Sequence, residues 1–278
     1  MKRIAIQGIA GSFHEDAALN YFDEEVEVVE CKSFTSVCQL VDADKVDYAV
    51  MAIENSIAGS LLKNYQLIRD YHLRIIGEIY IHIQMNLMVS PGVKRQDITD
   101  IYSHPVALQQ CVEYIKKYFP EARLHEGMDT AASAKKVAEE KLKNGAAIAN
   151  LRSADMYHLE VLESGIETNK KNYTRFVILS KHGNPTAGTN KASICFEGGH
   201  YHGALAKVLN IFAENEINLN KIQSVPILGK PNEYTIHVDL EWEKPDNYDR
   251  AIHQVLKSAS SLSILGEYIR GELDIHNQ

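Results

Sequence analysis

Small and hydroxyl-bearing residues follow four expected strands, where helices are expected to begin. These junctions are residues 8–12, 54–56, 103–105 and 129–130, and their candidate ligand-binding side chains are Ser12, Asn55, Ser56, Ser103, His104 and Thr130. Backbone N–H groups at a helix N-terminus, helped by the helix dipole, favour a bound anion. The same residue types also cap helices that bind nothing. Together the junctions indicate an anion held between two α/β lobes, at the strand ends where open α/β sheets bind ligands.

A fifth candidate segment, residues 172–176, reads Asn-Tyr-Thr-Arg-Phe. The guanidinium of Arg175 suits a bidentate contact with a carboxylate. The hydroxyl of Thr174 can donate a hydrogen bond to a departing oxygen. An ordinary surface Arg next to a buried Phe would give the same three residues, so the Thr-Arg-Phe triplet alone does not indicate a binding site.

Two βαβα units are expected to position these residues. Strands are predicted at 4–6, 26–29 and 48–53 in the first unit, and at 79–89, 101–102, 124–126 and 146–149 in the second. Alternating strands and helices imply mostly parallel sheets with covering helices. The chain returns to the first unit through a strand at 177–179. The expected lobes are therefore 1–77 with 162–181, and 78–161.

The rest of the chain follows a different pattern. Residues 182–191 are rich in Gly, Pro, Asn and Thr, as expected of a linker. Residues 192–278 alternate as βαββαβ, the ferredoxin-like order.

Composition narrows the classes of function. The net charge of −8 argues against nucleic acid as a partner. The four cysteines show no metal-ligand spacing, and free buried thiols are expected. No apolar run has the length of a signal peptide or a membrane helix, so a cytoplasmic location is expected, with no membrane partner. Residues 8–11 lack the full dinucleotide-binding pattern.

Five blocks of the chain, in order, strongly resemble the prephenate dehydratase family. They are Gly-Ile-Ala-Gly-Ser-Phe-His at 8–14, Ile-Glu-Asn-Ser-Ile-Ala-Gly at 53–59, Ser-His-Pro-Val-Ala-Leu-Gln-Gln-Cys at 103–111, Asp-Thr-Ala at 129–131 and Asn-Tyr-Thr-Arg-Phe at 172–176. The C-terminal part resembles an ACT domain, with Gly-Ala-Leu at 203–205. The resemblance covers essentially the whole chain.

The resemblance implies an α/β two-lobed catalytic region over 1–181, periplasmic-binding-protein-like of type II, followed by a ferredoxin-like ACT domain. It implies conversion of prephenate to phenylpyruvate in phenylalanine biosynthesis, with phenylalanine as effector. The ring becomes aromatic as carbon dioxide leaves, so no cofactor and no metal are expected. A homodimer or homotetramer is expected, since ACT domains of this family pair through their sheets.

Roles for single residues also follow from the resemblance. Thr174 is the catalytic residue, interpreted as a hydrogen-bond donor because an aliphatic alcohol is a poor acid. The substrate-binding candidates are those of the four junctions together with Arg175 and Phe176. Glu54 or His104 could supply the proton, although capping or packing is the alternative for each. The effector-binding candidates are Gly203, Ala204, Leu205, Asn218, Leu219 and Ser224.

One departure concerns the effector site. The family's ACT domain has Glu-Ser-Arg-Pro, and this chain has Gln223 and Val225 at the Glu and Arg positions. Phenylalanine binding is therefore expected with less support than catalysis. The alternatives are an arogenate dehydratase and a non-catalytic amino-acid or solute sensor, because fold alone does not decide function.

Overall fold

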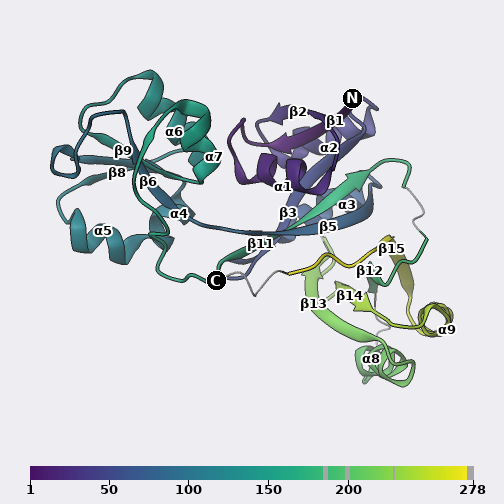
Figure 1. Cartoon of the computed structure of the whole chain (residues 1–278). Coiled ribbons are helices and arrows are strands. Elements are labelled where there is room, and N and C mark those ends of the chain that lie inside the picture. Colours follow the sequence, from purple (N-terminus) through teal and green to yellow (C-terminus); the bar gives the residue numbers. More distant parts are fainter. Residues whose placement is uncertain (184–186, 198–200, 228, 274–278) are drawn as a thin grey trace. The chain divides into compact units, whose positions relative to one another are not determined.

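The computed structural model describes residues 1–183, 187–197, 201–227 and 229–273, and its strands form three sheets (Figure 1). Strands and helices mostly alternate through the first two sheets, with directly successive strands within residues 48–60 and 74–89, and the order becomes βαββαβ in the third sheet. The second sheet is mixed, with two parallel and two antiparallel strand pairings, so the expectation of a mostly parallel sheet is wrong there.

The first sheet has the strand order β2-β1-β3-β11-β5, with β4 paired to β3. Its strands are β1 (Lys2–Gln7), β2 (Val26–Cys31), β3 (Tyr48–Asn55), β4 (Gly59–Ser60), β5 (Arg74–His82) and β11 (Tyr173–Ser180). β1 is parallel to β2 and to β3. Both faces of β1 and β3 are buried, as their unbroken apolar runs require. Helices α1 (Phe13–Tyr21) and α2 (Phe34–Asp42) pack on these strands, and α3 (Leu62–Asp70) follows β4.

The second sheet has the order β10-β6-β9-β7-β8. Its strands are β6 (Asn86–Val89), β7 (Asp100–Ser103), β8 (Arg123–Glu126), β9 (Gly145–Ala149) and β10 (Glu160–Glu163). Helix α6 (Thr130–Glu139) packs on β7 and β9 through buried alanines, which allow a close approach. The remaining elements are η1 (Arg95–Asp97), α4 (Pro105–Gln110), α5 (Val112–Tyr118) and α7 (Leu151–Tyr157).

The third sheet is antiparallel and has the order β13-β14-β12-β15. It comprises β12 (Lys191–Glu197), β13 (Asn218–Pro226), β14 (Tyr234–Glu241) and β15 (Ser261–Tyr268). Helices α8 (Ala204–Glu214) and α9 (Pro245–Leu256) contact each other and pack on it, around Phe196, Phe212 and Trp242 (Figure 1). This order is the ferredoxin-like one predicted from the sequence.

Several elements differ from the sequence-based expectations. The expected strand 79–89 is two strands, β5 and β6, and the expected helix after Pro105 is divided at Cys111 into α4 and α5. Helix α7 and strand β10 were not predicted. β3 turns directly into β4, so residues 54–56 begin a hairpin and not a helix. β11 begins at Tyr173, four residues earlier than the strand predicted at 177.

The chain divides into two compact units, the first comprising Met1–Asn64 and Ile79–Phe176, the second Tyr65–Glu78 and Val177–Gln278. Residues 65–78 group with the C-terminal part of the chain, although residues 74–78 also form part of β5 in the first sheet, and polar contacts join them to the third sheet. Lys191 Nζ lies 2.8 Å from Glu78 Oε1, and Arg69 Nη1 donates to Thr235 Oγ1 at 3.1 Å. The predicted domain boundaries stay a prediction, and the expected linker 182–191 includes residues 184–186, which lie outside the described residues.

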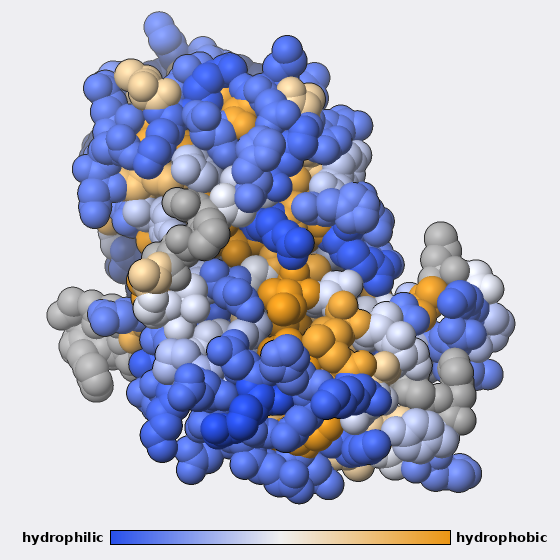
Figure 2. Space-filling model, turned by 90° about the vertical axis from the view of Figure 1, so that its right-hand side faces the viewer, coloured by the Kyte–Doolittle hydropathy of each residue, from blue (hydrophilic) through white to orange (hydrophobic). Residues whose placement is uncertain are grey.

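Most of the face shown in Figure 2 is hydrophilic, and hydrophobic residues gather in one patch near its centre. Apolar patches of this kind often mark places where ligands or partner proteins bind. The polar groups that could recognise a ligand lie in cavities of the first unit.

Candidate active site

A cavity of about 600 Å³, here called the Thr174 cavity, lies within the first unit. The N-cap residues of four helices, α1, α2, α4 and α6, line it: Ser12, Ser33, His104 and Asp129. Four helix N-termini therefore face one cavity, an arrangement that favours an anionic ligand. The junction at 54–56 contributes Asn55 from its hairpin, and α2 supplies the fourth helix start.

The loop between β1 and α1 offers fewer donors than expected. Ala10 N donates to Glu30 Oε1 at 2.6 Å, and Gly11 N donates to Glu15 Oε2 at 2.7 Å. Carboxylates of the chain itself thus occupy two amides of the Gly-rich loop. The loop contributes to the cavity through Ser12, the N-cap that follows it.

Thr174 lines the cavity and is fixed by Asn55. Asn55 Nδ2 donates to Thr174 Oγ1 at 2.9 Å and to Asn172 Oδ1 at 2.7 Å. Asn55 Oδ1 in turn accepts from Ile57 N at 3.0 Å and Ala58 N at 2.8 Å, so the orientation of the amide is determined. Because Thr174 Oγ1 accepts from Asn55, its own proton can be donated to a ligand.

Two histidines in the lining are held neutral. Burial lowers the pKa of His14 to about 4, and its ring packs against Phe176 with centroids 4.9 Å apart. Burial also lowers the pKa of His104, an effect that nearby Asp129 and Glu126 oppose. Val106 N donates to His104 Nδ1 at 3.2 Å, which places the proton of the neutral ring on Nε2. His104 is therefore a further donor at the cavity.

The charged side chains among the described residues that line the cavity are Lys32 and Asp129. Burial raises the pKa of Asp129, whereas the hydrogen bond from Ala132 N, 2.6 Å from Oδ1, lowers it. Thr130 and Phe176 also line the cavity, as expected of substrate-binding residues.

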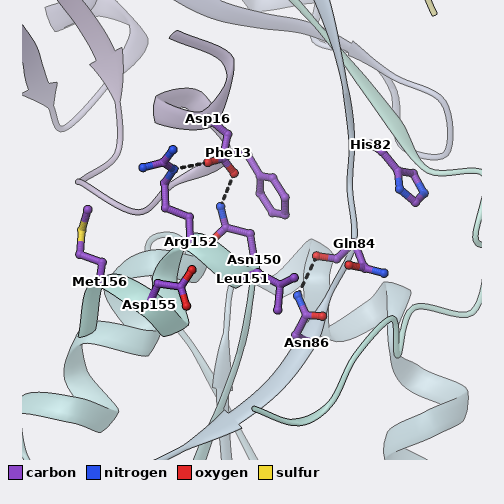
Figure 3. A pocket seen from close by; sticks show the side chains of 10 residues that line it. All are labelled: Phe13, Asp16, His82, Gln84, Asn86, Asn150, Leu151, Arg152, Asp155 and Met156. Atoms are coloured by element: carbon purple, nitrogen blue, oxygen red, sulfur yellow. Dashed lines mark hydrogen bonds and ion pairs between the residues drawn. The ribbon is translucent and has the colours of Figure 1, made fainter. Parts of the chain in front are cut away.

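A second cavity of the first unit, about 620 Å³, here called the Arg152 cavity, has a different character (Figure 3). Asp16 Oδ1 accepts from Arg152 Nε at 2.5 Å, and Asp16 Oδ2 accepts from Asn150 Nδ2 at 2.6 Å. Phe13 lines both cavities. The dashed lines in Figure 3 mark these two contacts, which engage both carboxylate oxygens of Asp16.

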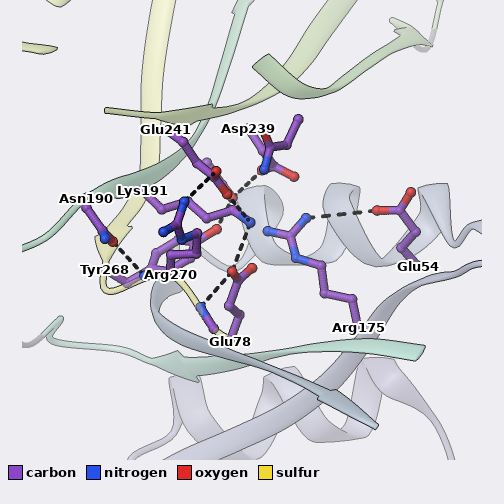
Figure 4. Close-up of polar contacts among 12 residues, drawn as sticks. Glu54, Glu78, Arg175, Asn190, Lys191, Asp239, Glu241, Tyr268 and Arg270 are labelled. Atoms are coloured by element: carbon purple, nitrogen blue, oxygen red, sulfur yellow. Dashed lines mark hydrogen bonds and ion pairs between the residues drawn. The ribbon is translucent and has the colours of Figure 1, made fainter. Parts of the chain in front are cut away.

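Arg175 does not line the Thr174 cavity, contrary to the expectation. Side chains alternate along β11, so Thr174 and Phe176 share one face and Arg175 lies on the other. Arg175 is 4% exposed, and its Nη1 lies 3.9 Å from Glu54 Oε2 (Figure 4). Glu54 is likewise absent from the lining, so the geometry does not support it as the acid.

Two serines of the junctions also lie outside the lining. Ser103 is fully buried and donates to Ile148 O at 2.6 Å. Ser56 Oγ donates to Lys171 O at 3.0 Å and accepts from Tyr173 N at 2.9 Å. Their hydroxyls stabilise the second sheet and the β3–β11 junction.

The effector candidates lie in the described part of the second unit. Gly203 is the N-cap of α8, with φ of +84°, a conformation that favours glycine. Ala204 is buried and Leu205 exposed. Asn218 and Leu219 begin β13, and Ser224 lies near its end. The role of these residues stays a prediction.

Metal and membrane signals are absent from the part of the chain that the structure describes. No three His, Cys, Asp or Glu side chains in it gather as metal ligands. None of its helices combines the length and the apolar character needed to cross a membrane.

Among the lining residues that sequence reasoning did not select are His14, Lys32, Ser33 and Asp129. Ser33 and Asp129 carry the signal of an N-cap before a helix. His14 stands in the first family block, one residue after Phe13. Lys32 carries no motif of its own, and its position next to the cap of α2 is the one available signal.

The model of the prephenate dehydratase family matches residues 4–184. The chain is 35% identical to arogenate dehydratase 5, chloroplastic, of Arabidopsis thaliana, over 96% of this chain and 67% of that protein. The structure of prephenate dehydratase from Arthrobacter aurescens in complex with L-Phe has a TM-score of 0.84 and 28% identity, covering 96% and 90% of the two chains. GqqA, described as a novel type of quorum quenching acylase, has a TM-score of 0.86 and 27% identity, covering 97% and 98%. These similarities confirm the expected periplasmic-binding-protein-like class of the first part of the chain.

Proposed function

The chain belongs to the prephenate dehydratase family, and from this premise we propose that it converts prephenate to phenylpyruvate in phenylalanine biosynthesis. The observation that carries the proposal is the hydroxyl of Thr174, which accepts from Asn55 and retains its proton for a ligand in a cavity faced by four helix N-termini. Prephenate is a dianion with a hydroxyl that must depart, so it matches both features.

The chemistry requires one proton and no redox change. The bond between the ring and its carboxylate breaks, and the electron pair moves into the ring. The C–O bond opposite breaks, and the departing oxygen takes up a proton to leave as water. One prephenate dianion and one proton thus give phenylpyruvate, carbon dioxide and water.

The residues of the cavity contribute positioning and hydrogen bonding. Thr174 donates to the departing hydroxyl, and Asn55 keeps the Thr174 side chain in the required orientation. Alignment of the reacting groups supplies several kcal/mol in well-oriented reactions. His104 lines the cavity with Nε2–H as donor. We therefore propose that the departing hydroxyl is protonated beside His104 and not beside Glu54.

The second unit is proposed to be an ACT domain that binds phenylalanine. Support comes from its ferredoxin-like order and from the relative solved with L-Phe. Asn218 and Ser224 are six residues apart on one strand, a span of roughly 20 Å, which exceeds the length of one amino acid. One effector cannot contact both within one chain, so a homodimer or homotetramer is proposed, with edge strand β13 available for pairing. A cytoplasmic location is retained as part of the proposal.

Arogenate is the competing substrate, because the Arabidopsis thaliana relative carries that name and because Asp129 places a carboxyl group in the cavity. The experiment mixes the purified chain with prephenate or arogenate and follows phenylpyruvate or phenylalanine by absorbance and chromatography. We expect turnover of prephenate with the higher kcat/KM. Binding of prephenate without any turnover would instead support the sensor and reject the enzyme.

A further inference from the structure

We propose that Lys32 selects the keto acid over the amino acid as substrate of the Thr174 cavity. The inference rests on the proposed dehydratase function and extends it to the residue that distinguishes prephenate from arogenate. It concerns a lysine outside the five family blocks.

The backbone places Lys32 at the ligand-binding edge of the first sheet. Lys32 follows Cys31, the last residue of β2, and precedes Ser33, the N-cap of α2. Gly8 N donates to Cys31 O at 2.9 Å, which holds the end of β2 beside the end of β1. The lysine therefore lies at the carboxyl end of two parallel strands, next to a helix N-terminus.

The charge of Lys32 is not matched by a carboxylate within the described part of the chain. Some exposed lysines have such partners, as Lys135 has in Glu139 at 3.8 Å, and others such as Lys143 form no ion pair with another described residue; what distinguishes Lys32 is its place in the cavity. In a chain of net charge −8, Lys32 is the one lysine or arginine among the described residues that line the cavity. Asp129, which also lines the cavity, accepts from Ala132 N.

The two substrates share the ring, the ring carboxylate and the hydroxyl, and they differ at the side chain. Prephenate ends in a keto group and a carboxylate, whereas arogenate has an ammonium group in place of the keto oxygen. A nearby lysine attracts the carboxylate of both but repels the ammonium group of arogenate alone. Discrimination through a like-charge contact is a common source of specificity. Lys32 should therefore change the ratio of the two activities more than it changes the chemical step.

The test measures kcat/KM for both substrates with the full chain and its Lys32→Met and Lys32→Glu variants. Lys143→Met is the matched control, because Lys143 is exposed and lies outside the cavity lining. We expect Lys32→Met to lower kcat/KM for prephenate roughly tenfold and for arogenate less, as a charge contact of partly exposed groups does. Lys32→Glu should shift the ratio further toward arogenate, and Lys143→Met should leave it unchanged.

Salt gives an independent measurement of the same contact. The preference of the wild-type chain for prephenate should decrease between low and high ionic strength, and that decrease should be absent in Lys32→Met. Equal losses for both substrates in the Lys32 variants, with an unchanged ratio, would overturn the inference and leave the dehydratase function intact. No turnover of either substrate by the wild-type chain would overturn both.

Discussion

The Thr174 cavity and the Arg152 cavity are similar in volume and lie in the same compact unit, with Phe13 lining both. They differ in what their polar groups do. In the Arg152 cavity, Asp16 is bonded to Arg152 and Asn150 (Figure 3). In the Thr174 cavity, Asn55 orients a hydroxyl whose proton is still available, and the Lys32 charge lacks a carboxylate among the described residues.

The difference separates a ligand site from a structural contact. Polar groups that pair with each other stabilise the fold, and they have fewer hydrogen bonds left to offer a ligand. A group that the protein holds in place through one hydrogen bond, and that still has another to offer, can bind a ligand with little reorganisation. Cavity volume alone would rank the two sites as equals. Substitutions in either cavity therefore test the difference between them.

The largest effect is expected for Thr174→Ala, which removes the donor at the departing hydroxyl. Turnover of prephenate should fall at least ~100-fold while the fold persists, because general acid or hydrogen-bond assistance typically contributes ~10²–10⁴-fold. Steady-state kinetics by phenylpyruvate absorbance measures it, with Thr174→Ser as the control that keeps the hydroxyl. Near-normal turnover of the alanine variant would remove Thr174 from the mechanism.

Asn55→Asp should have the next largest effect. The carboxylate cannot donate to Thr174 Oγ1, and it would accept the threonine proton that the substrate needs. We expect kcat to fall about 10- to 100-fold, the range typical of a lost positioning and polarising contact. A variant with normal kcat and normal thermal unfolding would show that the orientation of the hydroxyl is unimportant.

Substitutions in the Arg152 cavity should change stability and leave catalysis almost intact. Arg152→Met removes a charge-assisted hydrogen bond that is partly exposed, so the free energy of unfolding should fall by about 1 kcal/mol. Denaturant unfolding measures this change, and kcat should stay within about threefold of wild type. A large loss of kcat with unchanged stability would make this cavity, too, part of the catalytic site.

The smallest effect concerns pH. The folded-state pKa of His14, about 4, is lower than its ordinary value of 6.5, so the unfolded chain binds the proton more readily. The stabilising contribution is complete above pH 6.5 and is lost as the pH falls toward 4. Tm measured between pH 7 and pH 4.5 should decrease less steeply in His14→Asn than in wild type. Identical slopes would contradict the burial of a neutral His14.

Much of this comparison could be predicted from local sequence signals. The caps Ser12 and His104 lie where small or hydroxyl residues precede a helical pattern, and the ferredoxin-like order of the C-terminal part follows from its alternation. The face of Arg175 could not be predicted, because it depends on β11 beginning at Tyr173. A strand that starts at 177 would leave residues 173–176 in a loop, where the alternation of side chains does not apply.

Contacts between residues far apart in the sequence also could not be predicted from local patterns. The Asp16–Arg152 pair joins residues far apart in sequence, and α7 was not predicted because a seven-residue helix gives little periodicity. Residues 65–78 group with the C-terminal part of the chain through contacts such as that of Lys191 with Glu78 (Figure 4). No local sequence pattern predicts these contacts.

Calorimetric titration of the Thr174→Ala chain with prephenate, alongside a turnover assay of the same sample, tests the central claim most directly. We predict that the variant binds prephenate with a Kd close to that of wild type but turns it over very slowly. The helix N-termini and Lys32 hold the dianion, whereas Thr174 assists only the departing hydroxyl. Loss of prephenate binding in step with loss of turnover, or undiminished release of phenylpyruvate, would contradict this account of the cavity.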